Sequence, residues 1–361
     1  MTRALILAER NFDTWHQQYL RGEAIAPLPY GLEALERHGF QLEWARRQEA
    51  APWRKPRDVF EHRTGIPVER AIRGARLAAE ADVVIALLEQ QGYAVGRAKR
   101  WSIPPYARTP LVIWTCWLAD ELVTATPRRR SWLLRNVAAA DLITYFGPSG
   151  ADVLADMGFS AERILELTWG VTTAFYAPGD RARDIQVLAV GQDRGRDYGS
   201  LLAAFEALDF PLDLVCKPEN IAGLRVPANV RLHGTVGMAE YRALLQRAQV
   251  VAVPTHELVY PTGSSVALEA ASTGCAVVAT ATPGLSAYFD DGVDGRLVPR
   301  GDVDGWRRVL RELVTDEPQR ERLGAAARER VVRRNSSEVM WRELAQALDE
   351  RGLTTTSRTA T

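Results

Sequence analysis

The chain has 361 residues, of which 47% are hydrophobic and 25% are charged, and this composition is typical of a folded protein rather than a disordered or membrane-spanning one. Its length predicts two domains of ordinary size. Lysine and arginine together number 45, as do aspartate and glutamate, and this balance argues against a dedicated nucleic-acid-binding protein.

The first half of the chain alternates short apolar runs with helical patterns. Strands are predicted at 4–8, 83–87, 111–115, 142–145 and 164–167, and helices at 30–37, 68–79, 132–139 and after Pro148. This order predicts a parallel sheet covered by helices. The alternation pauses at 169–180, where Gly170, Pro178 and Gly179 indicate a linker.

The second half repeats the alternation. Strands are predicted at 185–190, 212–216, 230–233, 250–253 and 276–279, and helices at 198–207, 238–247, 265–273 and within 303–351. The Thr- and Ser-rich tail from Thr354 is predicted to be disordered. The fold class that follows is α/β, with two Rossmann-like domains.

Cysteines and histidines are few. Cys116, Cys216 and Cys275 form no close pair, which fits a reduced, cytoplasmic protein. The five histidines show no metal-ligand spacing on a helix, so the sequence predicts no structural metal.

Local basic runs interrupt the neutral balance at 54–57, 97–100 and 128–130. Such runs are commonly solvated faces, and a peripheral membrane role is the alternative. The apolar start, 1–8, is too short for a signal peptide, and no apolar stretch approaches the roughly 20 residues of a membrane-spanning helix. We therefore expect membrane association to be peripheral at most, and no nucleic-acid partner.

The most informative stretch is 260–269, Tyr-Pro-Thr-Gly-Ser-Ser-Val-Ala-Leu-Glu. A glycine loop before a helix exposes backbone N–H groups and the positive end of the helix dipole, which bind phosphate. Ser264 and Ser265 can cap the helix or donate hydroxyls to a ligand, and an ordinary serine cap is the alternative. Glu269 lies about one turn further, where it can accept hydrogen bonds from ribose hydroxyls.

A second loop, 191–198, follows the strand that ends at Val190. It combines Gly191 with Arg194 and Arg196 at the carboxyl end of a strand, where ligands of open α/β sheets bind. The two guanidinium groups can bind a diphosphate and offset its charge as it leaves, and surface arginines are the alternative. The sequence lacks the dinucleotide-binding, P-loop and nucleophile-elbow motifs, which disfavours dehydrogenases and hydrolases.

Taken together, these segments resemble the donor-site region of glycosyltransferase family 4, the retaining enzymes of the GT-B fold. The matching segments are 251–254, 263–274, 276–279, Gly284 and 291–298. Weaker similarity at 151–175, 190–205 and 229–234 extends the resemblance to about two thirds of the chain.

The resemblance implies two Rossmann-like domains that face each other across a cleft. It places an N-terminal acceptor domain at 1–168, a linker at 169–183 and a C-terminal nucleotide-sugar domain at 184–335. The segment 336–353 is a C-terminal helix, a candidate for packing back on the N-terminal domain, and 354–361 is the predicted disordered tail.

The resemblance also implies roles for residues in the two loops. Arg196, in the place of a family lysine, and Arg194 would act on the leaving diphosphate. The donor would be bound by Gly191, Lys217, Thr262, Gly263, Ser264, Ser265 and Glu269. Protein cations and helix amides would stabilise the leaving group, so neither a metal nor another cofactor is expected.

Two positions depart from the family pattern. The family pairs Glu269 with a glutamate eight positions earlier, where this chain has Pro261, so Thr262, Gly263 or Glu257 would substitute. Glu257 is equally readable as a surface loop residue.

The second departure follows the strand at 111–115, where the family often has a His-Asp pair. This chain has Trp117, which would stack on a sugar or belong to the core. Asp120 and Glu121 are the nearest carboxylates, and they would bind acceptor hydroxyls or be ordinary loop acids.

The function implied is transfer of a sugar from a nucleoside diphosphate sugar to the hydroxyl of an unidentified acceptor, with retention. The acceptor would be a sugar, a lipid-linked molecule or another small molecule. The alternatives are a nucleotide-sugar epimerase or phosphorylase of the same fold, and a non-catalytic partner subunit that binds nucleotide.

Overall fold

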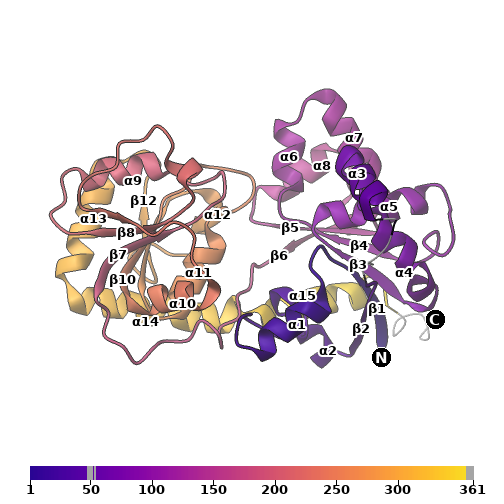
Figure 1. Cartoon of the computed structure of the whole chain (residues 1–361), viewed down its shortest axis with the longest axis horizontal. Coiled ribbons are helices and arrows are strands. Elements are labelled where there is room, and N and C mark those ends of the chain that lie inside the picture. The colour runs from indigo at the N-terminus through magenta and orange to yellow at the C-terminus, as the bar shows by residue number, and fades with distance from the viewer. Residues whose placement is uncertain (47–51, 53, 355–361) are drawn as a thin grey trace. The chain divides into compact units, whose positions relative to one another are not determined.

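The computed structural model describes residues 1–46, 52 and 54–354, and in it the chain forms two compact units. Unit 1 consists of Met1–Gln17, Pro27–Leu167 and the chain from Trp341, and unit 2 of Gln18–Ala26 and Thr168–Met340. Each unit contains a six-stranded parallel sheet with helices (Figure 1), so the predicted α/β class is confirmed. No helix of the described chain is both long and apolar enough to cross a membrane.

The sheet of unit 1 has the strand order β2-β1-β3-β4-β5-β6. Its central strands β3 and β4 are entirely apolar and buried, as expected where helices cover both faces of a parallel sheet. The order reverses direction between β1 and β3, where ligands of such sheets bind. The strands are β1 (Thr2–Leu7), β2 (Phe40–Trp44), β3 (Val83–Leu87), β4 (Leu111–Trp114), β5 (Leu142–Phe146) and β6 (Ile164–Leu167).

The helices of the first half are more numerous than predicted. The helix predicted at 30–37 is wrong in its first part, because Tyr30 and Gly31 have left-handed φ values of 61° and 67° within a 3-10 turn, and α2 begins only at Ala34. The helices are α1 (Phe12–Leu20), α2 (Ala34–Arg37), α3 (Arg54–Thr64), α4 (Val68–Glu80), α5 (Glu89–Arg100), α6 (Leu118–Thr124), α7 (Pro127–Val137) and α8 (Gly150–Asp156). The 3-10 turns are Pro29–Gly31 and Ala161–Arg163.

The sheet of unit 2 has the strand order β12-β11-β10-β7-β8-β9. Its direction reverses between β7 and β10, which are adjacent and parallel. The carboxyl ends of these two strands therefore define the predicted ligand position of unit 2. The strands are β7 (Ile185–Val190), β8 (Leu212–Val215), β9 (Val230–Leu232), β10 (Ala248–Val253), β11 (Ala276–Thr280) and β12 (Arg296–Val298).

The helices of unit 2 are α9 (Tyr198–Phe205), α10 (Met238–Arg247), α11 (Ser264–Ser272), α12 (Pro283–Ser286), α13 (Val303–Thr315) and α14 (Glu317–Arg334), with a 3-10 turn at Pro218–Ile221. Trp306 of α13 is 1% exposed and belongs to the core formed with β7, β8 and β10. The apolar stripe of α13 thus covers one face of the sheet.

The final helix, α15 (Ser337–Glu350), starts in unit 2, and from Trp341 onward it belongs to unit 1. Trp341 is fully buried, stacks on Trp114 at a centroid distance of 5.9 Å, and donates from Nε1 to the Tyr30 carbonyl at 2.8 Å. Thr354, the first residue of the predicted tail, is buried and its hydroxyl donates to Asp349. Residues 355–361 lie outside the described residues.

Candidate functional site

Two loops meet at the carboxyl ends of β7 and β10. Arg196 and Thr255 form an antiparallel bridge. On either side of it the Asp197 N–H donates to the Pro254 carbonyl at 3.1 Å, and the His256 N–H donates to the Gly195 carbonyl at 2.8 Å. The structure therefore brings the predicted loop at 191–198 against the segment that leads into 260–269.

The Arg196 side chain is buried at this junction, with 4% of it exposed. Its Nε lies 3.0 Å from Asp193 Oδ2. A Cβ atom on Gly191 would lie 2.1 Å from the same Nε, so only glycine leaves room for the guanidinium. Although burial alone would raise the pKa of Asp193, Arg196 together with hydrogen bonds from Thr262 and Gly195 holds that pKa below its usual value.

Four buried donors at this junction have no hydrogen-bond partner in the described chain: Nε and Nη1 of Arg196 and the hydroxyls of Ser264 and Thr255. Nε is within ion-pair distance of Asp193, but its N–H is not directed at the carboxylate. Buried polar groups normally have partners, and an unpartnered one is costly. Together these donors indicate a ligand that supplies acceptor oxygens.

Gly263 links Arg196 to the helix α11. It has a left-handed φ of 86°, and a Cβ atom there would lie 2.7 Å from Val253 Cγ1 and 2.9 Å from Arg196 Nη1. Gly263 occupies the cap position of α11, and no side-chain hydrogen bond caps the helix. The alternative of an ordinary serine cap is therefore wrong, because the Ser264 hydroxyl is not used for capping. Ser265, the next residue, is partly exposed.

Glu269 lies one turn further along α11, and the residue as a whole is partly buried. The Tyr241 hydroxyl donates to its Oε2. Burial raises the pKa of Glu269 to about 7, and this rise is opposed by hydrogen bonds from Tyr241 and Tyr176 and by the charge of Arg196. Glu269 is thus electrostatically linked to the buried guanidinium.

Other predicted donor-site residues lie at the edge of this region. Arg194 is exposed in the turn before Arg196. Lys217 is exposed at the start of the 3-10 turn after β8. Glu257 is exposed and forms an ion pair with Arg300 at 3.2 Å, so the structure places it on the surface of the loop.

Asp193 was not predicted from the sequence. Its Oδ1 accepts hydrogen bonds from the Thr262 hydroxyl at 2.6 Å and from the Gly195 N–H at 2.9 Å. Its spacing from Arg196 could have indicated this role, since an aspartate three residues before an arginine in a tight glycine loop is suited to an ion pair. Among the described residues, no group of three or more His, Cys, Asp or Glu side chains could hold a metal ion.

In unit 1, Trp117 is partly exposed before α6, and Asp120 is buried in the first turn of that helix. Glu89, which was not predicted, is 1% exposed and its Oε2 accepts from the Cys116 N–H at 3.3 Å. Burial raises the pKa of Glu89. The preceding residue, Leu88, has a left-handed φ of 72°. The sequence feature that could have indicated Glu89 is an acidic residue shortly after an apolar strand.

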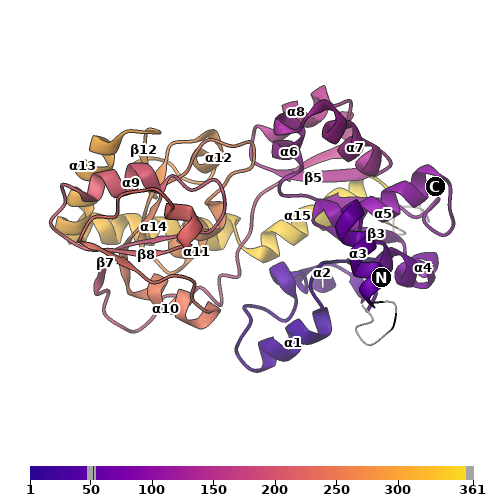
Figure 2. The same cartoon turned by 45° about the horizontal axis from the view of Figure 1, so that its top comes forward.

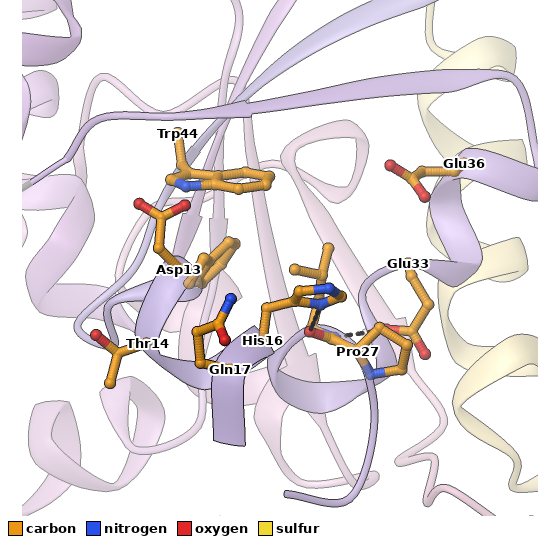
Figure 3. Close-up of a pocket in the computed structure, with 10 residues that line it drawn as sticks. Asp13, Thr14, His16, Gln17, Pro27, Glu33, Glu36 and Trp44 are labelled. Carbon is orange, nitrogen blue, oxygen red and sulfur yellow. Dashed lines mark hydrogen bonds between the residues drawn. The ribbon is translucent and has the colours of Figure 1, made fainter. Parts of the chain in front are cut away.

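A pocket of about 490 Å³ opens in unit 1 at the carboxyl ends of β1 and β2 (Figure 3). Its lining residues come from α1, the following loop, α2 and β2, and they are Phe12, Asp13, Thr14, His16, Gln17, Pro27, Leu28, Glu33, Glu36 and Trp44. None of the acceptor-contact residues predicted from the sequence, Trp117, Asp120 or Glu257, is among them.

The pocket combines aromatic faces with polar groups. Figure 3 shows Asp13 next to the indole of Trp44, and the imidazole of His16 beside Pro27, whose carbonyl lies 3.4 Å from Nδ1. Trp44 also contacts Phe12 at a ring-centroid distance of 5.2 Å. Glu33 Oε2 accepts from the Leu28 N–H at 3.2 Å, and burial raises the pKa of Glu33. Such a lining suits a molecule with both an apolar face and several hydroxyls.

Known proteins resemble this chain most clearly in unit 2. Residues 217–330 match the family described as "Glycosyl transferases group 1". A relative named MMP alpha-(1->4)-mannosyltransferase, from Mycolicibacterium hassiacum, is 31% identical over 206 residues, which are 53% of this chain and 49% of that protein. A D-inositol 3-phosphate glycosyltransferase from Thermobifida fusca is 28% identical over 279 residues, 75% of this chain and 56% of that protein. The chain thus spans about half the length of these relatives.

Solved structures share the fold of the whole chain. A sucrose-phosphate synthase from Thermosynechococcus elongatus aligns with a TM-score of 0.68 at 16% identity, covering 97% of this chain and 98% of that one. The Anabaena protein Alr3699/HepE, solved with UDP and glucose, aligns with a TM-score of 0.68 at 15% identity, covering 97% and 100%. The predicted GT-B fold and the resemblance to its glycosyltransferases are confirmed.

Proposed function

Since the chain has the GT-B fold and a group 1 glycosyl transferase segment, we propose that it transfers a sugar from a nucleoside diphosphate sugar to an acceptor hydroxyl. The observation that carries this proposal is the buried Arg196 guanidinium, whose unpartnered N–H groups lie beside Gly263 and the start of α11. A solvent-excluded cation next to a helix N-terminus is suited to a diphosphate.

In this proposal the donor diphosphate lies at the start of α11. The Ser264 hydroxyl and the N–H groups of Arg196 bind its oxygens, and Gly191 and Gly263 leave space for the guanidinium between them. Glu269 accepts hydrogen bonds from the ribose hydroxyls, because a carboxylate has about four acceptor positions and the hydroxyls of Tyr241 and Tyr176 use only part of them.

Charge on the diphosphate grows as the bond to the sugar breaks. Arg196, held by Asp193, offsets that charge without having to reorganise, and this favours the transition state over the ground state. We therefore propose that the reaction needs no divalent metal. Retention of anomeric configuration is part of the proposal, and its support is the family resemblance.

The acceptor is proposed to bind in the pocket of unit 1. The ring of a polyol would pack on Trp44, with its hydroxyls reaching Asp13, Gln17 and Glu36. Three of the ten lining residues are carboxylic acids and none is lysine or arginine. The pocket therefore favours an uncharged polyhydroxyl acceptor over one that carries phosphate.

A cytoplasmic setting is also proposed, because no disulfide joins the cysteines of the described chain and Cys216 and Cys275 are buried in unit 2.

The donor site is tested by binding of nucleoside diphosphates. UDP, GDP and ADP are compared by thermal denaturation, and we expect one of them to raise the melting temperature. At a ligand concentration of a hundred times Kd, binding should add about 2.7 kcal/mol to the free energy of unfolding. Failure of all three would refute the donor site. Binding without turnover, assayed by mass spectrometry with the matching nucleotide sugars and a panel of sugars and polyols, would favour the non-catalytic alternative.

A further inference from the structure

Large apolar side chains are exposed together on one flank of unit 1. Phe60 is 50% exposed, Ile72 71%, Trp101 65% and Ile103 46%. They line a groove of about 500 Å³ formed by α3, α4, α5 and the segment at 101–106. Figures 1 and 2 both show these three helices side by side in unit 1. Clusters of exposed apolar side chains mark binding surfaces more often than scattered ones do.

The same part of the chain carries a surplus of positive charge. Residues 54–108 contain eleven Lys and Arg against six Asp and Glu, whereas the whole chain is neutral. Arg63, Arg76 and Arg100 are exposed, and none of them forms an ion pair with another residue in the described part of the chain. The surface thus combines apolar and cationic groups.

The spacing of these arginines sets them beside the apolar side chains. Arg63 follows Phe60 by three positions on α3, and Arg76 follows Ile72 by four on α4, so each pair shares a helix face. Arg100 directly precedes Trp101 at the end of α5. Phe60 and Ile72 therefore each share a helix face with an exposed arginine, and Trp101 has Arg100 next to it in the sequence.

We propose that this face of unit 1, the groove with Arg63, Arg76 and Arg100, binds the surface of a membrane that contains anionic lipids. Trp101, Ile72 and Phe60 would enter the boundary between headgroups and acyl chains, while the arginines remain at the lipid phosphates. The charge surplus favours this partner over a second copy of the neutral chain. This surface lies on the described elements α3 to α5 and does not depend on sugar transfer.

The test is co-sedimentation of the full-length protein with vesicles of phosphatidylcholine alone or mixed with phosphatidylglycerol. We expect binding to the mixed vesicles only, weakened as sodium chloride is raised from about 0.1 to about 0.5 M. The variants are I72S/W101S, which removes apolar tips, and R63E/R76E/R100E, which reverses the charge. Each should weaken binding at least about tenfold. All substituted residues are exposed, so we expect the variants to fold, and circular dichroism checks this.

The matched control is V332S/R334E on α14 of unit 2, where Val332 is 45% exposed and Arg334 is also exposed. It should bind vesicles as the wild type does. Absence of vesicle binding, equal binding by all variants, or equal binding to pure phosphatidylcholine would overturn the proposal. So would a dimer, measured by light scattering, that the groove variants abolish. Affinity for nucleoside diphosphate is measured on the same variants and should not change, which separates this proposal from the proposed function.

Discussion

The Thr262 hydroxyl donates a 2.6 Å hydrogen bond to the Asp193 carboxylate, which lies 69 positions earlier in the sequence. Asp193 in turn holds Arg196, so Thr262 positions the guanidinium through one intermediate side chain. The neighbouring residue is Pro261, where the family has a glutamate. Pro261 packs so closely on Gly284 that a Cβ atom added to Gly284 would lie 2.8 Å from the Cα of Pro261. Residue 261 therefore supplies no carboxylate, and its neighbour Thr262 is hydrogen-bonded to the carboxylate of Asp193 instead.

Replacing Thr262 by valine should loosen this arrangement. The change preserves shape and removes one hydrogen bond, so we expect a loss of about 1 kcal/mol in unfolding free energy and a several-fold rise in donor KM. Urea denaturation and steady-state kinetics measure the two effects. The matched control for stability is Thr255→Val, because the buried Thr255 hydroxyl has no hydrogen-bond partner in the described chain. Equal stabilities of the two variants would show that the Thr262 contact contributes nothing.

Removing the Glu269 carboxyl should weaken nucleotide binding. Because the ribose hydroxyls would lose a charged acceptor, Glu269→Ala should cost roughly 1.5 to 3 kcal/mol of binding free energy. Isothermal titration with the nucleoside diphosphate that binds the wild type gives this value. Glu240→Ala, at an exposed position one residue before Tyr241, should bind normally. Unchanged affinity in the Glu269 variant would mean that this carboxyl only partners the tyrosines.

Much of the fold and part of the site could be predicted from the sequence. The strands at 83–87, 164–167 and 185–190 have the predicted bounds, because buried parallel strands are continuous apolar runs with sharp ends. Helices such as α1 and α3 were missed, since α3 has no buried residue and hence no apolar stripe to detect. Asp193 and the unit 1 pocket were missed for another reason: they depend on contacts between distant segments, which no local pattern records.

Stability should depend on pH through Glu269. Burial raises the pKa of this carboxyl to about 7, from 4.5 for an ordinary glutamate. Between these values the folded protein retains a proton that the unfolded chain releases, so the stabilisation is complete below pH 4.5 and is lost as pH rises through about 7. Glu269→Gln removes this titration. From about pH 5 to about pH 7.5 the wild type should lose on the order of 1 to 3 kcal/mol more than the variant does, as measured by urea denaturation. Parallel pH profiles would contradict the raised pKa.

Turnover should persist in excess EDTA, because Arg196 and the start of α11 are proposed to offset the charge of the leaving diphosphate. Initial rates with and without chelator should agree within error for protein freed of metal beforehand. A loss of activity that magnesium or manganese restores would instead indicate a metal-dependent reaction, and Arg196 would then have a binding role only.

Loss of the Arg196 guanidinium should affect the chemical step more than donor binding. The group is buried beside Gly191 and Gly263, and charge develops on the diphosphate only as the sugar departs. Arg196→Ala should therefore lower kcat on the order of 100-fold, as removal of an oxyanion donor does in other enzymes. Arg196→Lys should recover part of the rate, because the point charge remains although the bidentate geometry is lost. Arg194→Ala is the matched comparison, and its effect should be smaller because Arg194 is exposed in the same loop. The Asp193 carboxylate loses its ion-pair partner in the alanine variant, so circular dichroism and urea denaturation must first show that the protein is folded. A folded Arg196→Ala protein with near-normal kcat would remove Arg196 from the reaction and make Arg194 or Lys217 the next residue to test.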